Sequence, residues 1–221
     1  MPIHPWRSQR LVFTAIEPED DDFLSSIQAD AESYFNAAGF LVVPQAKSSA
    51  AGSREYFRDK CLLAVKICLP SPASAQPNAA SGGDAAISRP IPIGTIALTK
   101  AEANQSQHRN GSIGINLLRA HQGQGYGSEA IRWALRWGFR YGNLHRIEIG
   151  AFGWNQGAIR LYKRLGFVPE GCKREHLWYD GKYWDLVELG MLESEWREQY
   201  GDEENAVAGV EKSNGDVAVK S

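Results

Sequence analysis

A glycine-rich loop between a predicted strand and a predicted helix constrains this chain more than any other feature. The loop is Gln122-Gly123-Gln124-Gly125-Tyr126-Gly127; a strand-like run over residues 112–118 precedes it, and an amphipathic helix is expected to begin near Ser128. Glycines allow a ligand to approach the backbone closely because they carry no Cβ. A helix start adds unpaired N–H groups and the positive end of the helix dipole. The loop therefore predicts a site for an anion, most simply a phosphate or pyrophosphate.

Two common phosphate-binding motifs do not fit the spacing of this loop. A dinucleotide fingerprint requires G-x-G-x-x-G, and although Gly123 and Gly125 fit, the third glycine position is Ser128. A Walker-type loop ends in Gly-Lys-Ser/Thr, whereas no lysine occurs between Lys100 and Lys163. A different phosphate carrier is therefore expected.

The loop does match the pattern Gln/Arg-x-x-Gly-x-Gly/Ala, and in this respect it resembles the acetyl-CoA loop of the GNAT superfamily of N-acetyltransferases. A second segment strengthens the resemblance. A strand-like run over residues 144–151 precedes Asn155, Tyr162 and Gly166-Phe167, similar to the family pattern in which an Asn opens a helix that ends in Tyr-x-x-x-Gly-Phe. The chain most resembles the branch of ribosomal-protein N-terminal and diamine acetyltransferases, over residues 8–196 and most strongly over 112–192.

The resemblance implies a fold and an activity. We expect an α/β domain over residues 8–196, with a GNAT-like mixed, twisted sheet of six or seven strands flanked by helices on both faces. The implied activity is acetyl-CoA-dependent transfer of an acetyl group to a primary amine of a small molecule or a peptide N-terminus. Two alternatives remain open: a non-catalytic acyl-CoA sensor or interaction module, and a structural protein that retains only the fold.

The resemblance also implies which residues contact acetyl-CoA, from the end of one predicted strand to the second motif. Asn155 has an alternative role as a helix N-cap. Both Asn155 and Tyr162 are expected to project toward one groove, because they lie two helical turns apart. The predicted contacts are Leu117, Leu118, Gln122, Gly123, Gln124, Gly125, Tyr126, Gly127, Ser128, Asn155 and Tyr162.

The resemblance further implies that Tyr162 lies near the cofactor sulfur and protonates the departing thiolate; the alternative is a core tyrosine with a bonded hydroxyl. Glu148 is the candidate general base, and its alternative is an ion pair with Arg146 or another basic neighbour. His121 adjoins the loop and is expected to contact it rather than to act as the base. Asp185 is expected to shape the acceptor site.

The composition of the remaining segments indicates which of them are flexible and where a tight turn occurs. Residues 70–90 consist almost entirely of small and polar types and are expected to form a flexible insertion in a hairpin, while residues 197–221 are expected to form a disordered acidic tail. Asp180-Gly181 predicts a tight hairpin turn between two late strands. The aromatic residues beside that turn are expected to pack across the strands, with a place in the acceptor pocket as the alternative.

The charge and cysteine content narrow the functional class. A net charge of −2 over 221 residues and a pI near 6.2 argue against a nucleic-acid or anionic-membrane surface. Cys61, Cys68 and Cys172 have no metal-like spacing, so we expect reduced thiols and no metal. No apolar run approaches the roughly 20 residues that span a bilayer. We therefore expect a cytoplasmic or nuclear protein, and the sequence leaves monomer and homodimer both open.

Overall fold

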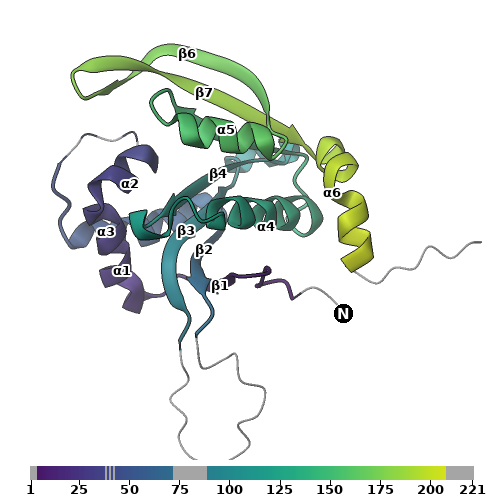
Figure 1. The fold of residues 1–221 in the computed structure, drawn as a ribbon, viewed down its shortest axis with the longest axis horizontal. Helices are drawn as coiled ribbons and strands as arrows, with labels where there is room; N and C mark the ends of the chain where they lie inside the picture. Colours follow the sequence, from purple (N-terminus) through teal and green to yellow (C-terminus); the bar gives the residue numbers. More distant parts are fainter. Residues whose placement is uncertain (1–3, 38, 40, 42, 72–88, 208–221) are drawn as a thin grey trace, which may run out of the picture.

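The computed structural model describes residues 4–37, 39, 41, 43–71 and 89–207, with side chains to residue 201. Its central element is a seven-stranded mixed sheet in the order β1-β2-β3-β4-β5-β7-β6 (Figure 1). The sheet is open, with β1 and β6 at its edges. The expected GNAT-like architecture is thereby confirmed. The strands are β1 (Val12–Ala15), β2 (Cys61–Leu69), β3 (Ile91–Thr99), β4 (Asn110–Leu117), β5 (Arg146–Phe152), β6 (Val168–Tyr179) and β7 (Lys182–Leu192).

Helices cover both faces of this sheet (Figure 1). One face carries α4 and α5, which follow the two motifs found in the sequence. The other face carries α1 to α3, and α6 packs beside α4 through a contact between Phe139 and Trp196. The helices are α1 (Asp21–Ala29), α2 (Ala31–Ala37), α3 (Ser48–Lys60), α4 (Tyr126–Arg140), α5 (Gln156–Arg164) and α6 (Glu193–Val207), with 3₁₀ turns η1 (Pro18–Asp20), η3 (Ala103–His108) and η4 (Arg119–His121).

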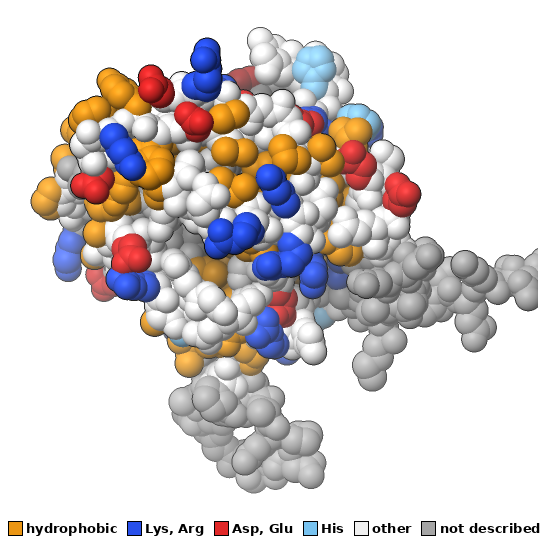
Figure 2. Space-filling view, turned by 45° about the horizontal axis from the view of Figure 1, so that its top comes forward, with side chains coloured by type: hydrophobic (Ala, Val, Ile, Leu, Met, Phe, Trp, Pro, Cys, Tyr) orange, Lys and Arg blue, Asp and Glu red, His pale blue; other side chains and the backbone are white. Residues whose placement is uncertain are grey.

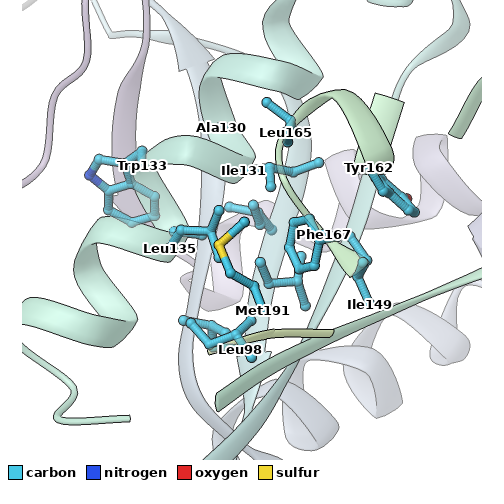
Figure 3. Close-up of a cluster of buried hydrophobic side chains, with 14 of the residues drawn as sticks. Leu98, Ala130, Ile131, Trp133, Leu135, Ile149, Tyr162, Leu165, Phe167 and Met191 are labelled. Carbon is cyan, nitrogen blue, oxygen red and sulfur yellow. The ribbon is translucent and has the colours of Figure 1, made fainter. Parts of the chain in front are cut away.

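The main core lies between the sheet and α4 (Figure 3). Alternate residues of each strand point to this side, as strand geometry requires. Leu98 of β3, Ile147 of β5 and Leu135 of α4 are all buried there. Gly138 of α4 permits this close approach, because a Cβ at that position would lie 2.7 Å from Cδ1 of Ile147. The helix after the glycine loop is thus held rigidly against the sheet.

The parallel pair β4 and β5 separates part-way along its length. Pairing runs from Asn110↔Arg146 to Ile113↔Ile149 and stops there. Beyond that point β4 continues to Leu117, paired with β3 only, and β5 continues to Phe152, paired with β7 only. We call this separation the splay. It leaves two strand edges facing each other inside the sheet, beside the start of the glycine loop.

Two sequence predictions need correction, and one falls partly outside the described residues. Helix α4 begins at Tyr126, two residues before the expected start, because Gly125 serves as its N-cap. The predicted disordered tail is wrong for residues 197–207, because α6 extends to Val207. Strands β2 and β3 form an antiparallel pair, as the predicted hairpin requires, but the insertion itself lies largely within residues 72–88, which are not described.

Candidate active site

The glycine loop presents a row of backbone donors at the start of α4. Gly123 and Gly125 adopt positive φ angles of 72° and 84°, a region that residues with a Cβ rarely occupy. The first backbone hydrogen bond of the helix runs from Glu129 N to the Gly125 carbonyl. Among the described residues, no protein group accepts a hydrogen bond from the backbone N–H groups of 123–128. These donors are therefore available to an anion, and the positive end of the helix dipole lies with them.

Glutamine side chains hold the loop in this shape. The Gln122 amide donates to the Leu117 carbonyl at 2.9 Å and to the Ser33 hydroxyl at 2.8 Å, which ties the loop to the end of β4 and to α2. Gln124 donates to the Ala120 carbonyl at 2.8 Å. The side chains of both glutamines are therefore engaged in shaping the loop, and the row of N–H groups remains for a ligand.

Arg10 clasps the loop from the N-terminal segment, a contact that sequence reasoning missed. Its guanidinium donates to the Gln124 carbonyl at 3.0 Å and to Glu129 at 2.8 Å, and lies 4.7 Å from the centre of the Tyr126 ring. Burial raises the pKa of the Glu129 carboxyl, but hydrogen bonds from Arg10 and Ser8 outweigh burial and leave that pKa below its usual value. No local signal marks Arg10, because more than a hundred residues separate it from the loop.

Asn155 is the N-cap of α5, which was the alternative to its predicted contact with acetyl-CoA. Its side-chain oxygen accepts from the Ala158 N–H at 3.1 Å, which satisfies one of the free donors of the first turn. Gln156 begins the helix directly afterward. The capping bond uses only the amide oxygen, and among the described residues nothing accepts a hydrogen bond from the amide nitrogen of Asn155, which can therefore donate to a ligand.

Tyr162 lies in the buried cluster between α5 and the sheet rather than along an open groove. It is only 7% exposed, and its ring lies 6.2 Å from that of Phe167. Figure 3 shows its oxygen at the end of the ring that points away from Leu165 and Phe167. Burial raises the pKa of the hydroxyl from 10.0 to about 12. Among the described residues nothing forms a hydrogen bond with this hydroxyl, which leaves it available to a ligand.

Glu148 lies on the opposite face of the sheet from Tyr162. Ile147 and Ile149 of β5 enter the core with Tyr162, and strand alternation therefore directs Glu148 to the face of α1 to α3. Its carboxylate accepts from Arg146 Nε at 3.0 Å, and Arg146 also forms a two-pronged ion pair with Glu170. The structure thus contains the ion pair that was the alternative to a base role, although the Glu148 side chain stays half exposed.

The late hairpin contributes an aromatic wall near α2. Its two-residue turn, Asp180-Gly181, has positive φ at both positions, as the sequence predicted for a tight hairpin. Trp178 and Tyr183 pair across the strands with ring centres 4.8 Å apart, which confirms cross-strand packing for this pair. Asp185 accepts from the Glu175 N–H at 2.9 Å and so holds the irregular part of β6. The inner aromatic members, which contact one another, are Phe35, Phe152, Trp154, Tyr179 and Trp184.

On the face of the molecule shown in Figure 2, acidic and basic side chains lie among hydrophobic ones. The His121 ring lies 6.4 Å from that of Tyr126, so His121 contacts the loop as expected. Within the described ranges, no group of three or more His, Cys, Asp or Glu side chains could hold a metal ion. No helix in the part of the chain that the structure describes is long and apolar enough to cross a membrane.

Comparison with known proteins identifies the family. The sequence profile of the acetyltransferase (GNAT) domain matches residues 10–168, which includes the glycine loop, the splay and α5. The chain belongs to the GNAT acetyltransferase family. The family resemblance predicted from the two motifs is therefore confirmed, and this GNAT chain extends beyond the matched range by the β6–β7 hairpin and α6.

Curated relatives of this GNAT chain carry acetyltransferase names. A spermidine N(1)-acetyltransferase of Vibrio cholerae is 34% identical over 89 residues, which are 40% of this chain and 51% of that protein. An uncharacterized N-acetyltransferase p20 of Bacillus licheniformis is 28% identical over 193 residues, which are 86% of this chain and 96% of that protein. This chain thus spans about half the length of the first of these relatives.

Solved structures match the whole fold. A spermidine N-acetyltransferase from Vibrio cholerae, crystallised with CoA and spermine, has a TM-score of 0.64 and 21% identity, over 86% of this chain and 99% of that one. A GNAT-family acetyltransferase from Bacillus anthracis has a TM-score of 0.63 and 18% identity, over 85% of this chain and 98% of that one. At this level of identity the likeness establishes the fold.

Proposed function

We propose that this protein is an acetyl-CoA-dependent N-acetyltransferase that moves an acetyl group to a primary amine of a small molecule or a peptide N-terminus. The observation that carries the proposal is the row of free N–H groups from Gly123 to Ser128, adjacent to the splay between β4 and β5. Membership in the GNAT family and relatives named N-acetyltransferases support it. The neighbour crystallised with CoA and spermine has the same fold.

In this proposal the loop binds the pyrophosphate of acetyl-CoA. Backbone donors suit a pyrophosphate because they are fixed in position before binding and require no side chain to be ordered. The pantetheine arm then extends into the splay, where the free edge of β4 at Gly114–Leu117 offers backbone groups and Asn155 offers its amide nitrogen. When bound, acetyl-CoA supplies the activated thioester. Positioning of both substrates at the splay is the main contribution of the protein to the rate.

Proton transfers complete the reaction. The neutral amine attacks the thioester carbonyl, the new C–N bond forms and the C–S bond breaks. We assign the amine proton to Glu148, directly or through water, because this carboxylate is half exposed beside the last paired residues of the splay. The hydrogen bond from Arg146 to Glu148 would weaken when Glu148 takes up the proton, while the ion pair of Arg146 with Glu170 remains.

The raised pKa of the Tyr162 hydroxyl limits how this residue can act on the departing thiolate. A thiol has a reference pKa of about 8.5, so complete proton transfer from a hydroxyl of pKa about 12 to a thiolate is uphill by roughly 5 kcal/mol. Donation of a hydrogen bond to the sulfur, while negative charge develops there, carries no such cost. We therefore propose that Tyr162 stabilises the departing thiolate as a hydrogen-bond donor, and that solvent supplies the final proton.

A pair of glycine variants tests the loop assignment. Gly123 and Gly181 both have positive φ (72° and 77°), and a Cβ at either position would meet nothing within 4 Å. Gly123→Ala and Gly181→Ala therefore impose similar backbone strain, of about 1–2 kcal/mol, in the loop and in the distant hairpin respectively. By calorimetry, only Gly123→Ala should lose acetyl-CoA affinity, by tenfold or more. Equal affinity in both variants and the parent would reject the loop assignment.

A second measurement tests catalysis separately from binding. Release of free thiol from acetyl-CoA in the presence of a panel of primary amines should exceed the rate without an amine. Tight CoA binding with no acetylation of any amine would instead favour the acyl-CoA sensor.

A further inference from the structure

A cavity of about 520 Å³ lies on the face of the sheet opposite α4, between the sheet and α1 to α3. Its sheet wall comes from β3 and β4 and includes Gly114, Ile115 and Asn116, which belong to the part of β4 that forms one edge of the splay. The volume is in the range of small-molecule sites. The cavity therefore meets the place where acetyl transfer is proposed to occur.

Two glycines keep this cavity wide. Gly52 lies inside α3 and Gly114 inside β4, and both line the cavity. Neither has a positive φ, and a Cβ at either position would meet nothing within 4 Å. A glycine inside a helix costs about 1 kcal/mol relative to alanine. Neither the backbone conformation nor close packing therefore explains why these two residues are glycines. A larger side chain at either position would instead occupy part of the cavity.

The described residues that line the cavity carry no charge. They include no Asp, Glu, Lys, Arg or His. Two acidic side chains of the neighbouring helices are engaged in ion pairs: Asp21 pairs with Arg54, and Glu32 pairs with Arg119. The lining is instead apolar, aromatic and neutral polar, with Tyr34, Tyr56 and Phe57 as its aromatic members. A second ammonium group placed here would therefore lose water without gaining a carboxylate.

We infer that the acceptor bound in this cavity is a primary amine carried on an uncharged body, apolar or aromatic. This inference rests on the proposed acetyl transfer and deepens it. It separates the protein from relatives named for spermidine, a polyamine with several positive charges. A small aryl-alkyl amine and a peptide N-terminus with an apolar first side chain share this chemistry.

The test compares 2-phenylethylamine, tyramine, a Phe-Ala dipeptide amide and spermidine. We expect kcat/KM for 2-phenylethylamine and for tyramine, each with a single amine on an aromatic body, to exceed that for spermidine at least tenfold. The kcat/KM of the dipeptide amide relative to those of the free amines shows whether the acceptor is a peptide N-terminus or a small aryl-alkyl amine. Equal or better use of spermidine overturns the inference while leaving acetyl transfer to amines intact.

Two variants of Gly52 locate the effect in the cavity. Gly52→Leu should raise the KM for 2-phenylethylamine at least tenfold with acetyl-CoA affinity unchanged, whereas Gly52→Ala, which strengthens the same helix, should raise it only slightly. An unchanged KM in Gly52→Leu overturns the inference.

Direct binding distinguishes failure of this inference from failure of the proposed function. If 2-phenylethylamine binds the parent by calorimetry and binds Gly52→Leu at least tenfold more weakly, but no amine or peptide of the panel is acetylated, the cavity still binds this class of amine and the proposed function falls. If it does not bind even in the presence of CoA, the cavity assignment falls, whatever amines the protein acetylates.

Discussion

The hydroxyl of Tyr162 links the stability of the protein to alkaline pH in a way that one substitution can isolate. Burial raises its pKa from 10.0 to about 12. Because the pKa is higher in the folded than in the unfolded protein, this contribution to stability is fully present below pH 10. It is lost as the pH rises toward 12, since the unfolded chain ionises first.

The magnitude follows from the two pKa values. A tenfold change in an ionisation equilibrium is worth about 1.4 kcal/mol, so the complete loss amounts to roughly 3 kcal/mol. Between pH 9 and pH 11 the parent should lose about 1.4 kcal/mol of unfolding free energy through Tyr162 alone. Tyr162→Phe removes this term and leaves the ring in place. Other groups that titrate in this range, including Cys61, are common to both proteins and cancel in the difference.

The assay is urea denaturation of the parent and Tyr162→Phe at pH 8, 9, 10 and 11. At pH 8 the two should be nearly equally stable, because the hydroxyl forms no hydrogen bond with any described residue. By pH 11 the variant should be more stable by about 1.4 kcal/mol. Parallel pH curves for the two proteins would refute the reasoning, because they would mean that the hydroxyl is no harder to ionise when folded.

The same variant measures the proposed catalytic role. A hydrogen bond to a charged group is worth about 1.5–3 kcal/mol, so its loss in the transition state should lower kcat by about 10- to 150-fold. The dissociation constant of acetyl-CoA should change little, because charge develops on the sulfur only as the thioester breaks. Equal turnover of parent and variant on a working acceptor would remove Tyr162 from the mechanism.

Two further predictions concern Glu148 and Asn155. Glu148→Gln should lower kcat on a working amine by about 100-fold or more, the usual size of general-base catalysis, whereas Glu170→Gln, which removes the other carboxylate on Arg146, should lower it far less; equal kcat in both variants and the parent would assign Glu148 to the ion pair alone. Asn155→Ala should lower the unfolding free energy by about 1 kcal/mol through loss of the cap on α5, measured in urea without ligand. An unchanged stability would mean that Asn155 contributes to ligand binding rather than to the helix.

Local sequence signals predicted the parts of this site that depend on a few consecutive residues. Glycines at 123 and 125 allow a ligand to approach the backbone closely, and the hydrophobic stripe after them predicts a helix packed on the sheet, so the loop and α4 could be predicted from sequence alone. Only the start of α4 was placed two residues late, because glycine at 125 can itself cap a helix. The Asp180-Gly181 hairpin was predicted for the same local reason.

Contacts between distant segments could not be predicted in this way. The clasp of Arg10 on the loop and the ion pair of Arg146 with Glu170 depend on strand order, which the sequence does not state. The cavity could not be predicted from the sequence either, because its helical wall comes from residues 24–57, where the apolar pattern is weak. Helix α6 was missed beyond residue 197 because its sequence is acidic and has little apolar periodicity; among the side chains that the structure describes, Trp196 and Tyr200 join it to the core.

The separation of β4 and β5 has a mechanical consequence. Past Ile113 and Ile149, the sheet divides into two leaves, β1 to β4 and β5, β7 and β6, which are joined by four paired positions and by the core under α4. A ligand that spans the gap would contact both leaves and couple their motions. Backbone amides of both leaves should then exchange with solvent together rather than independently, so the cofactor would act as a structural strut as well as an acetyl donor.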